Sequence, residues 1–179
     1  MSQFDKALDK LSAAEKRAIV RGLKGQQAVR VHNHDWGDKH IRFGYCSDTH
    51  IGHKEFKEEL WDKMGQFFKK EKVELVYHAG DILEGMSGRE GHIYELRHIG
   101  ITAQLNAAAS LIRSADFHLM GILGNHDIWA MAKANMGINV GQTLEDNVPN
   151  FTHLGDWEAD VKLAPHITLK LYHGNDGTA

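Results

Sequence analysis

The sequence predicts an α/β protein with a mostly parallel central sheet, because apolar stretches of strand length alternate with amphipathic stretches of helical length. The expected strands lie at 41–46, 73–77 and 117–123, and the expected helices between them lie at 55–70 and 93–113. Strands that are joined through helices in this way pair in parallel, with right-handed crossovers. The residues that follow the strands should therefore meet at one edge of the sheet, where open α/β sheets bind their ligands.

Ahead of the sheet, residues 1–24 are expected to form an N-terminal helical segment. Their apolar positions recur at helical spacing, and Ser12 with Glu15 matches a capping box that restarts a helix. A packing appendage is the favoured interpretation, with part of a helix-turn-helix as the alternative. Residues 25–39 are more polar and are expected to be a linker into the main domain, which is assigned to 40–179.

The last third of the chain changes in character. Two short helices are expected at 128–136 and 141–147, and three strands follow at 151–154, 157–163 and 166–172. These strands either pair antiparallel at the far side of the sheet or begin a second sheet.

Composition describes an ordinary globular chain of one domain, with 179 residues of which 42% are hydrophobic and 25% are charged. A net charge of −3 excludes a bulk polycation that grips nucleic acid by charge alone. A single cysteine, Cys46, excludes an internal disulfide framework, and no secretory signal or membrane-length apolar run is found, so a cytoplasmic protein is expected. The 13 histidines stand out and suggest ligands or proton carriers.

Residues that can ligate a metal follow four of the expected strands. Asp48 and His50 follow the first strand, Asp81 the second, Asn125 the third and His173 the last. A mixed set of carboxylate, imidazole and amide ligands suits Mn²⁺ best here, with Fe, Zn²⁺ or Ni²⁺ as alternatives. Asp81 has two oxygens with which to bridge two ions, and such a pair can clamp a phosphate and hold a hydroxide for in-line attack.

Three further residues are assigned roles around this expected metal site. His126, at the tip of the third turn, is expected to protonate the leaving oxygen, with its ring oriented by Asp127. Arg89 lies in a glycine-rich loop that follows Asp81, and its guanidinium is expected to hold a phosphate oxygen.

Simpler explanations compete with each of these assignments. Helix capping and turn formation account for Asp and Asn at strand ends, although they do not call for a histidine at two of the junctions. His126 could only ligate a metal or support its turn, His173 could be structural, and the loop of Arg89 could be a surface loop without a substrate role.

The ordered segments Asp48-X-His50, Gly80-Asp81, Gly124–Asp127 and His173-Gly174 resemble those of the calcineurin-like metallophosphoesterases. The resemblance covers roughly residues 40–174 and is strongest to the branch of DNA-repair exonucleases and phage-type phosphoesterases. It implies a sandwich of α/β/β/α layers.

The resemblance also implies a role for each matched residue. Asp48 and His50 would bind the first of two divalent metals, and Asp81 would bridge both. The remaining matched residues would bind the second metal or serve as the leaving-group acid: Asn125 and His173 for the metal, and His126 for the acid.

Two departures from the family pattern accompany this resemblance. The position three residues after Asp81, often Asp or His in the family, is Glu84. The Gly-His-X-His segment that contributes one ligand to each metal is not found after His173, so the fold is expected to be incomplete at its C-terminus. The expected function is hydrolysis of phosphodiester bonds in nucleic acid, with DNA as a candidate substrate, or in nucleotides. The alternative is a weakly active or non-catalytic metal-binding or scaffolding module of the same fold.

Overall fold

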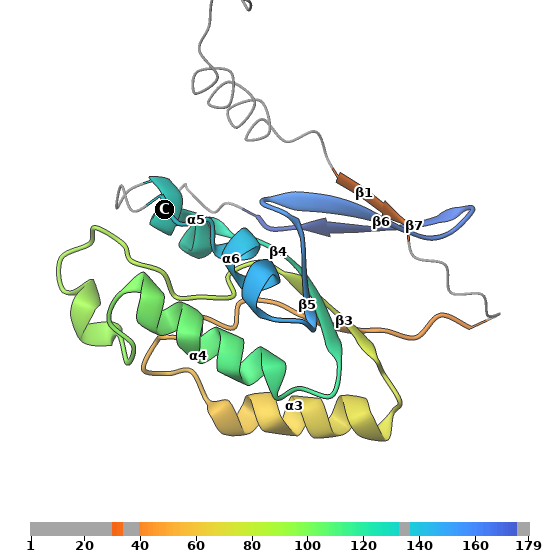
Figure 1. Ribbon diagram of the computed structural model, residues 1–179, viewed down its shortest axis with the longest axis horizontal. Coiled ribbons are helices and arrows are strands. Elements are labelled where there is room, and N and C mark those ends of the chain that lie inside the picture. Colours follow the sequence, from red (N-terminus) through yellow and green to blue (C-terminus); the bar gives the residue numbers. More distant parts are fainter. Residues whose placement is uncertain (1–29, 34–39, 133–136, 175–179) are drawn as a thin grey trace, which may run out of the picture.

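A computed structural model describes residues 30–33, 40–132 and 137–174 of the chain (Figure 1). The N-terminal helical segment expected at 1–24 lies outside these residues, as does most of the linker expected at 25–39. Residues 30–33 of that expected linker form a strand instead. No helix in the described residues is long and apolar enough to cross a lipid bilayer.

The elements alternate between strands and helices for most of the chain. They are, in order, β1 (Arg30–Asn33), β2 (Gly44–Cys46), α3 (Glu58–Lys70), β3 (Leu75–Ala79), the 3₁₀ helix η1 (His92–Glu95), α4 (Ile101–Arg113), β4 (His118–Ile122), α5 (Asn125–Ala132), α6 (Val140–Asn147), β5 (Phe151–Gly155), β6 (Glu158–Ala164) and β7 (Ile167–Tyr172).

The main sheet contains four strands in the order β2-β3-β4-β5, and all three pairings are parallel. This confirms the α/β fold with a mostly parallel central sheet. The β5 strand, for which sequence left antiparallel pairing or a second sheet open, joins this sheet in parallel. A crossover through α5 and α6 precedes it, and such a connection is the one that parallel neighbours require.

A second sheet has the order β1-β6-β7 and faces the first (Figure 1). In it, β6 and β7 form an antiparallel hairpin, while β1 pairs with β6 in parallel. The second sheet is thus one of the two arrangements that the alternating pattern of the last strands permitted. The strand at Arg30–Asn33 was not predicted, because four residues within a polar stretch are too few to show the alternation of apolar and polar residues that marks a strand.

Two apolar cores lie on the two faces of the parallel sheet. The alternation of side chains along β3 places Val76 among the residues that pack under α3 and α4, and it places Leu75 and Tyr77 in the core between the sheets. Figure 1 shows α3 and α4 on one face of this sheet and the second sheet on the other. The parallel sheet is therefore covered on both faces, which explains why its central strands are almost wholly apolar.

The helix predicted at 93–113 is interrupted. Residues His92–Glu95 form only a 3₁₀ turn, Leu96 is extended, and α4 begins at Ile101 after Gly100, whose φ is 91°. A positive φ is easily adopted by glycine and ends regular helix geometry, so the apolar period continues through this segment while the backbone does not. The long connection from β3 to α4 is consequently a loop that lies beside the strand ends.

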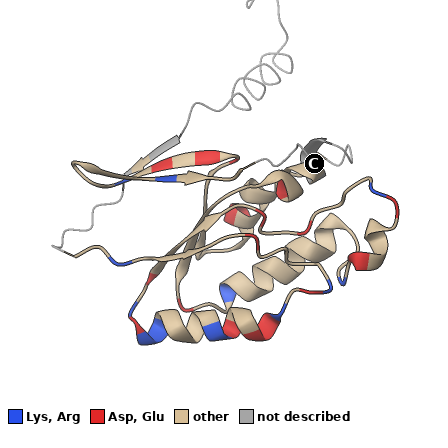
Figure 2. Ribbon diagram, turned by 180° about the vertical axis from the view of Figure 1, so that it is seen from behind, with Lys and Arg blue, Asp and Glu red and all other residues tan. Residues whose placement is uncertain are grey.

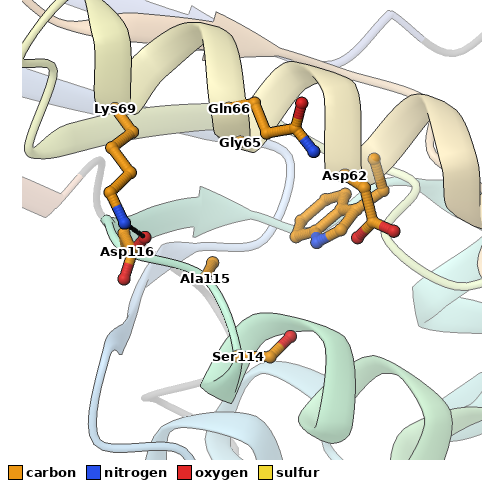
Figure 3. Close-up of a pocket in the computed structure, with 8 residues that line it drawn as sticks. Asp62, Gly65, Gln66, Lys69, Ser114, Ala115 and Asp116 are labelled. Carbon is orange, nitrogen blue, oxygen red and sulfur yellow. Dashed lines mark hydrogen bonds and ion pairs between the residues drawn. The ribbon is translucent and has the colours of Figure 1, made fainter.

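Charged residues of both signs lie on α3, and a small cavity lies beside this helix. Figure 2 shows both acidic and basic residues along α3, consistent with a solvated helix face. A cavity of about 210 Å³ lies between α3 and the turn after α4, where Lys69 pairs with Asp116 at 2.8 Å beside the buried Trp61 (Figure 3). This turn leads into the amino end of β4, so the cavity is at the opposite end of the sheet from the predicted site.

Candidate metal centre

The loops that follow β2, β3 and β4 meet at the carboxyl edge of the parallel sheet, as predicted for an open α/β protein. A pocket of about 380 Å³ opens here. Its lining comes from the first two of these loops and from the start of the chain toward α3: Asp48, Thr49, His50, His53, Glu55, Phe56 and Glu84.

At this edge, three residues have the left-handed backbone conformation that residues other than glycine rarely adopt. Asp48, His50 and Asp81 have φ values of 54°, 48° and 55°. Hydrogen bonds between the first two loops hold these conformations: the Asp48 N–H donates to the Gly80 carbonyl at 3.0 Å, and the His50 N–H donates to the Asp81 carbonyl at 3.1 Å. Left-handed backbone outside glycine concentrates at functional sites, where surrounding contacts offset its cost.

Asp81 is the centre of the cluster. Its carboxylate is buried, and Oδ2 lies 3.8 Å from His50 Nε2, 3.9 Å from His126 Nε2 and 3.4 Å from His173 Nε2. The His50 Nε2 atom is also 3.9 Å from Asp48 Oδ1. Four side chains predicted from the strand ends, those of Asp48, His50, His126 and His173, are thus gathered around the carboxylate of a fifth, Asp81.

Asn125 completes this group through His173. The His173 ring donates from Nδ1 to the Ala79 carbonyl at 2.9 Å, and its Nε2 atom lies 3.0 Å from Asn125 Oδ1. With the proton on Nδ1, both Nε2 and the amide oxygen present lone pairs to the same region. A cation satisfies two such acceptors at once.

The donor set fits divalent metal ions. In each of two triads, one ligand atom from every residue lies within 4.8 Å of those of the other two: His50, Asp81 and His126 form one triad, and Asp48, Asp81 and His173 form the other. Asp81 belongs to both, which is the arrangement that a bridging carboxylate requires. Mixed imidazole and carboxylate ligands suit first-row transition metals better than Ca²⁺, which prefers oxygen ligands alone.

The Glu84 carboxylate contacts two histidines, one in the cluster and one beside it. This buried carboxylate places Oε2 2.9 Å from His50 Nδ1, an ion-pair distance, and Oε1 2.8 Å from His92 Nε2. Burial opposes ionisation of Glu84, but His50, His92 and His126 outweigh it and lower the pKa of the carboxyl to about 2. Conversely, burial lowers the pKa of His50, yet the carboxylates of Glu84, Asp81 and Asp48 raise it above its ordinary value.

His126 takes its orientation from Glu84 and not, as predicted, from Asp127. The His126 Nδ1–H donates to the Glu84 main-chain carbonyl at 2.7 Å, so Nε2 faces Asp81. The Trp129 ring stacks over His126 with centroids 4.0 Å apart. The tautomer and the face of the imidazole are therefore set by the loop after β3 and by α5.

Asp127 has a different task, because its carboxylate is wholly buried and turned toward the backbone. It accepts hydrogen bonds from the N–H groups of Gly124 at 3.0 Å, Ile82 at 3.1 Å and Leu83 at 2.8 Å. Burial raises the pKa of Asp127 to about 6, although these three donors oppose the rise. The residue joins the loops after β3 and β4.

Arg89 does not join the cluster. Its exposed guanidinium pairs with Glu95 of η1 in the loop that follows Glu84. To contact a phosphate at the metal ligands, the side chain would have to leave Glu95. Its assignment to substrate binding therefore stays a prediction.

Three residues of the site were not assigned from sequence: Glu84, His92 and His78. Glu84 had a signal in its position three residues after Asp81, whereas the other two had none beyond proximity to the motifs. His78 is fully buried at the end of β3, where it accepts from the Gly80 N–H at 3.2 Å. Burial lowers the pKa of His78 to about 3, so this ring is neutral in the folded protein.

Comparison with known proteins agrees with this geometry. A family model described as calcineurin-like phosphoesterase matches residues 41–177, which is well over half of the chain. The DNA polymerase II small subunit of Halobacterium salinarum is 28% identical over 112 residues, which cover 60% of this chain and 22% of the relative. The DNA polymerase II small subunit of Archaeoglobus fulgidus is 29% identical over 143 residues, which cover 73% of this chain and 29% of the relative. The chain thus spans less than a third of the length of these relatives.

Proposed function

The chain belongs to the calcineurin-like phosphoesterase family, and from this membership we propose that it is a binuclear metal-dependent phosphodiesterase that hydrolyses DNA. One observation carries the proposal: donor atoms of three histidines approach a single buried carboxylate oxygen, that of Asp81. A structural role would not require imidazoles from three separate segments to share one oxygen. Neutral or metal-bound imidazoles avoid the repulsion that three imidazolium rings would feel there.

The residues are proposed to divide between two metals as the family resemblance implies. Asp48 and His50 would hold the first, Asn125 and His173 would hold the second, and Asp81 would be shared by both. Divalent cations at these positions supply Lewis-acid polarisation of the phosphoryl oxygens and offset the negative charge of the transition state. Mn²⁺ is the expected ion, with Fe, Zn²⁺ or Ni²⁺ as alternatives for the same ligands.

His126 is proposed as the acid that protonates the leaving oxygen. Its Nδ1 atom is committed to the Glu84 carbonyl, so the proton for transfer resides on Nε2, the atom that faces the cluster. The Glu84 carboxylate oxygen Oε1 also lies 3.6 Å from Nδ1 of this ring. Proton donation of this kind contributes roughly 10²–10⁴-fold to rate.

DNA is proposed as substrate because the relatives are named as subunits of a DNA polymerase. Because the net charge is −3, DNA would have to be held by local contacts: the bound metals, and Arg89 after its guanidinium has left Glu95. We propose accordingly that the chain works within a larger assembly that contains other polymerase subunits.

Hydrolysis by the metal-loaded chain tests this function. The protein is stripped with a chelator, reloaded with Mn²⁺, and assayed on end-labelled single-stranded DNA and on bis-p-nitrophenyl phosphate. We expect cleavage that Asp81→Asn abolishes and that Asp62→Asn, an exposed change on α3, leaves intact. Elemental analysis should find two ions per chain in the wild type and fewer in Asp81→Asn.

A non-catalytic module of the same family is the second candidate. The relatives bear the name of a polymerase small subunit, which describes assembly and not hydrolysis. Absence of cleavage with Mn²⁺, Fe²⁺, Zn²⁺ and Ni²⁺, together with fewer than one ion per chain, would favour this candidate. Two tightly held ions without cleavage would leave a metal-binding structural module.

A further inference from the structure

His92 is a buried histidine that the proposed reaction does not use. Its ring, at the start of η1, is 2% exposed and is separated from the metal ligands by Glu84. The Ser87 N–H donates to His92 Nδ1 at 3.2 Å, so the ring carries its proton on Nε2. That proton is directed at Glu84 Oε1, at 2.8 Å.

The opposite oxygen of the same carboxylate faces the metal site. Glu84 Oε2 lies 2.9 Å from His50 Nδ1, and a negative charge at that distance favours the tautomer with the proton on Nδ1. The His50 Nε2 atom, which faces Asp48 and Asp81, is then left with the lone pair that a metal ligand must offer. The order of contacts is therefore Ser87, His92, Glu84 and His50.

A second contact links His92 to the proposed acid. The His92 and Trp129 rings are perpendicular, at 90° with centroids 6.4 Å apart, and the same Trp129 packs against His126 with the two rings tilted by 35°. His92 thus contacts Glu84, which lies against the proposed metal ligand His50, and Trp129, which packs against the proposed acid His126. Its place in the loop between β3 and α4 connects that loop to the cluster.

We propose that His92 is a positioning residue, which holds the Glu84 carboxylate so that His50 presents Nε2 to the metal site. The proposal rests on the proposed function for the identity of the ligand, a divalent transition metal, but the tautomer of His50 can be measured without any metal. Ligand-orienting contacts of this kind typically change metal affinity by about 10- to 100-fold when they are removed.

Two variants separate positioning from packing. His92→Leu replaces the ring with an apolar side chain and so removes both of its hydrogen bonds, to the Ser87 N–H and to Glu84. His92→Gln keeps a donor for Glu84 and an acceptor for the Ser87 N–H, so it should restore what the leucine loses. His98→Leu, a half-buried histidine of the same connection, is the matched control.

The first measurement is the tautomer of His50 in the metal-free full chain, from ¹⁵N shifts of the histidine ring nitrogens at pH 8. The wild type, His92→Gln and His98→Leu should show His50 with its proton on Nδ1, and His92→Leu should show a mixture of tautomers. An unchanged His50 in His92→Leu would overturn the proposal, as would a failure of His92→Gln to restore it.

The second measurement is Co²⁺ affinity from visible absorption. His92→Leu should bind Co²⁺ about 10- to 100-fold more weakly than the wild type, with recovery in His92→Gln. Equal affinity in His92→Leu and the wild type would contradict the proposal. If the wild type bound no Co²⁺ while the His50 tautomer still shifted in His92→Leu, the positioning role would stand and the proposed function would fail.

Discussion

The Asp127 carboxylate accepts a hydrogen bond from the Leu83 N–H at 2.8 Å and so joins the loop after β4 to the loop after β3. Two further backbone donors, Gly124 and Ile82, use the same carboxylate. Of the proposed metal ligands, Asp81 lies on the loop after β3 and Asn125 begins α5, directly after the loop that follows β4. Their separation is therefore set by a residue that contacts neither a metal nor a substrate in the proposed reaction.

Asp127→Ala should be strongly destabilising, because it leaves three N–H groups without their acceptor at a buried position. Each buried unsatisfied group costs about 1–3 kcal/mol, so we expect a loss of at least about 3 kcal/mol in the free energy of unfolding. Urea denaturation of the metal-free chain measures it. Asp116→Ala, at an exposed ion pair, is the control, and a loss equal to that control would contradict the role assigned to Asp127.

Gly124→Ala should disable the metal centre. A Cβ at this position would lie 2.1 Å from Asp81 Oδ1 and 2.7 Å from His173 Nε2, so both side chains must move. We expect Mn²⁺ affinity, measured by calorimetry, to fall by at least about tenfold. A Cβ at Gly88 would have no neighbouring atom within 4 Å among the described residues, and Gly88→Ala should bind Mn²⁺ like the wild type. Tight binding by Gly124→Ala would show that neither side chain is a ligand.

Tyr77→Phe should leave the protein as stable as the wild type or raise its stability by about 1 kcal/mol. Among the described residues the buried Tyr77 hydroxyl has no hydrogen-bond partner, and burial raises its pKa to about 12. The ring still packs against Phe43, with centroids 5.2 Å apart, after the hydroxyl is removed. A fall in melting temperature of several degrees would reveal a polar partner for the hydroxyl.

His78 should make the protein sensitive to acid. Burial lowers its folded pKa to about 3 from the ordinary 6.5, so between these values the unfolded chain binds a proton that the folded chain does not. Above about pH 6.5 the ring is neutral in both states and does not change the free energy of unfolding with pH. As the pH falls from 6.5 toward 3, the free energy of unfolding falls by up to about 1.4 kcal/mol per pH unit. Denaturation of metal-free wild type and His78→Gln from pH 4 to 8 measures this. Parallel curves for the two proteins would refute it.

Local patterns in the sequence predicted most of the parallel sheet. Apolar runs bounded by polar residues identified β2, β3 and β4, because central strands covered on both faces are apolar at successive positions. The same reasoning failed where local and tertiary preferences differ. The apolar period at 93–113 continues through η1, but Gly100 interrupts the helix, and β1 forms only because β6 offers it an edge.

The sequence by itself also determined which residues cluster. Asp48, His50, Asp81, Asn125 and His173 follow strands, and parallel strands bring their carboxyl ends to one edge. Only the tertiary structure decided how these residues are oriented. Adjacency in the sequence assigns Asp127 to His126, yet its carboxylate turns to the backbone. Glu84, three residues after Asp81, and His92 of η1 contact the imidazoles instead. The position of a strand along the chain is encoded by short-range periodicity, whereas the partner of a buried polar group depends on which loops fold over it.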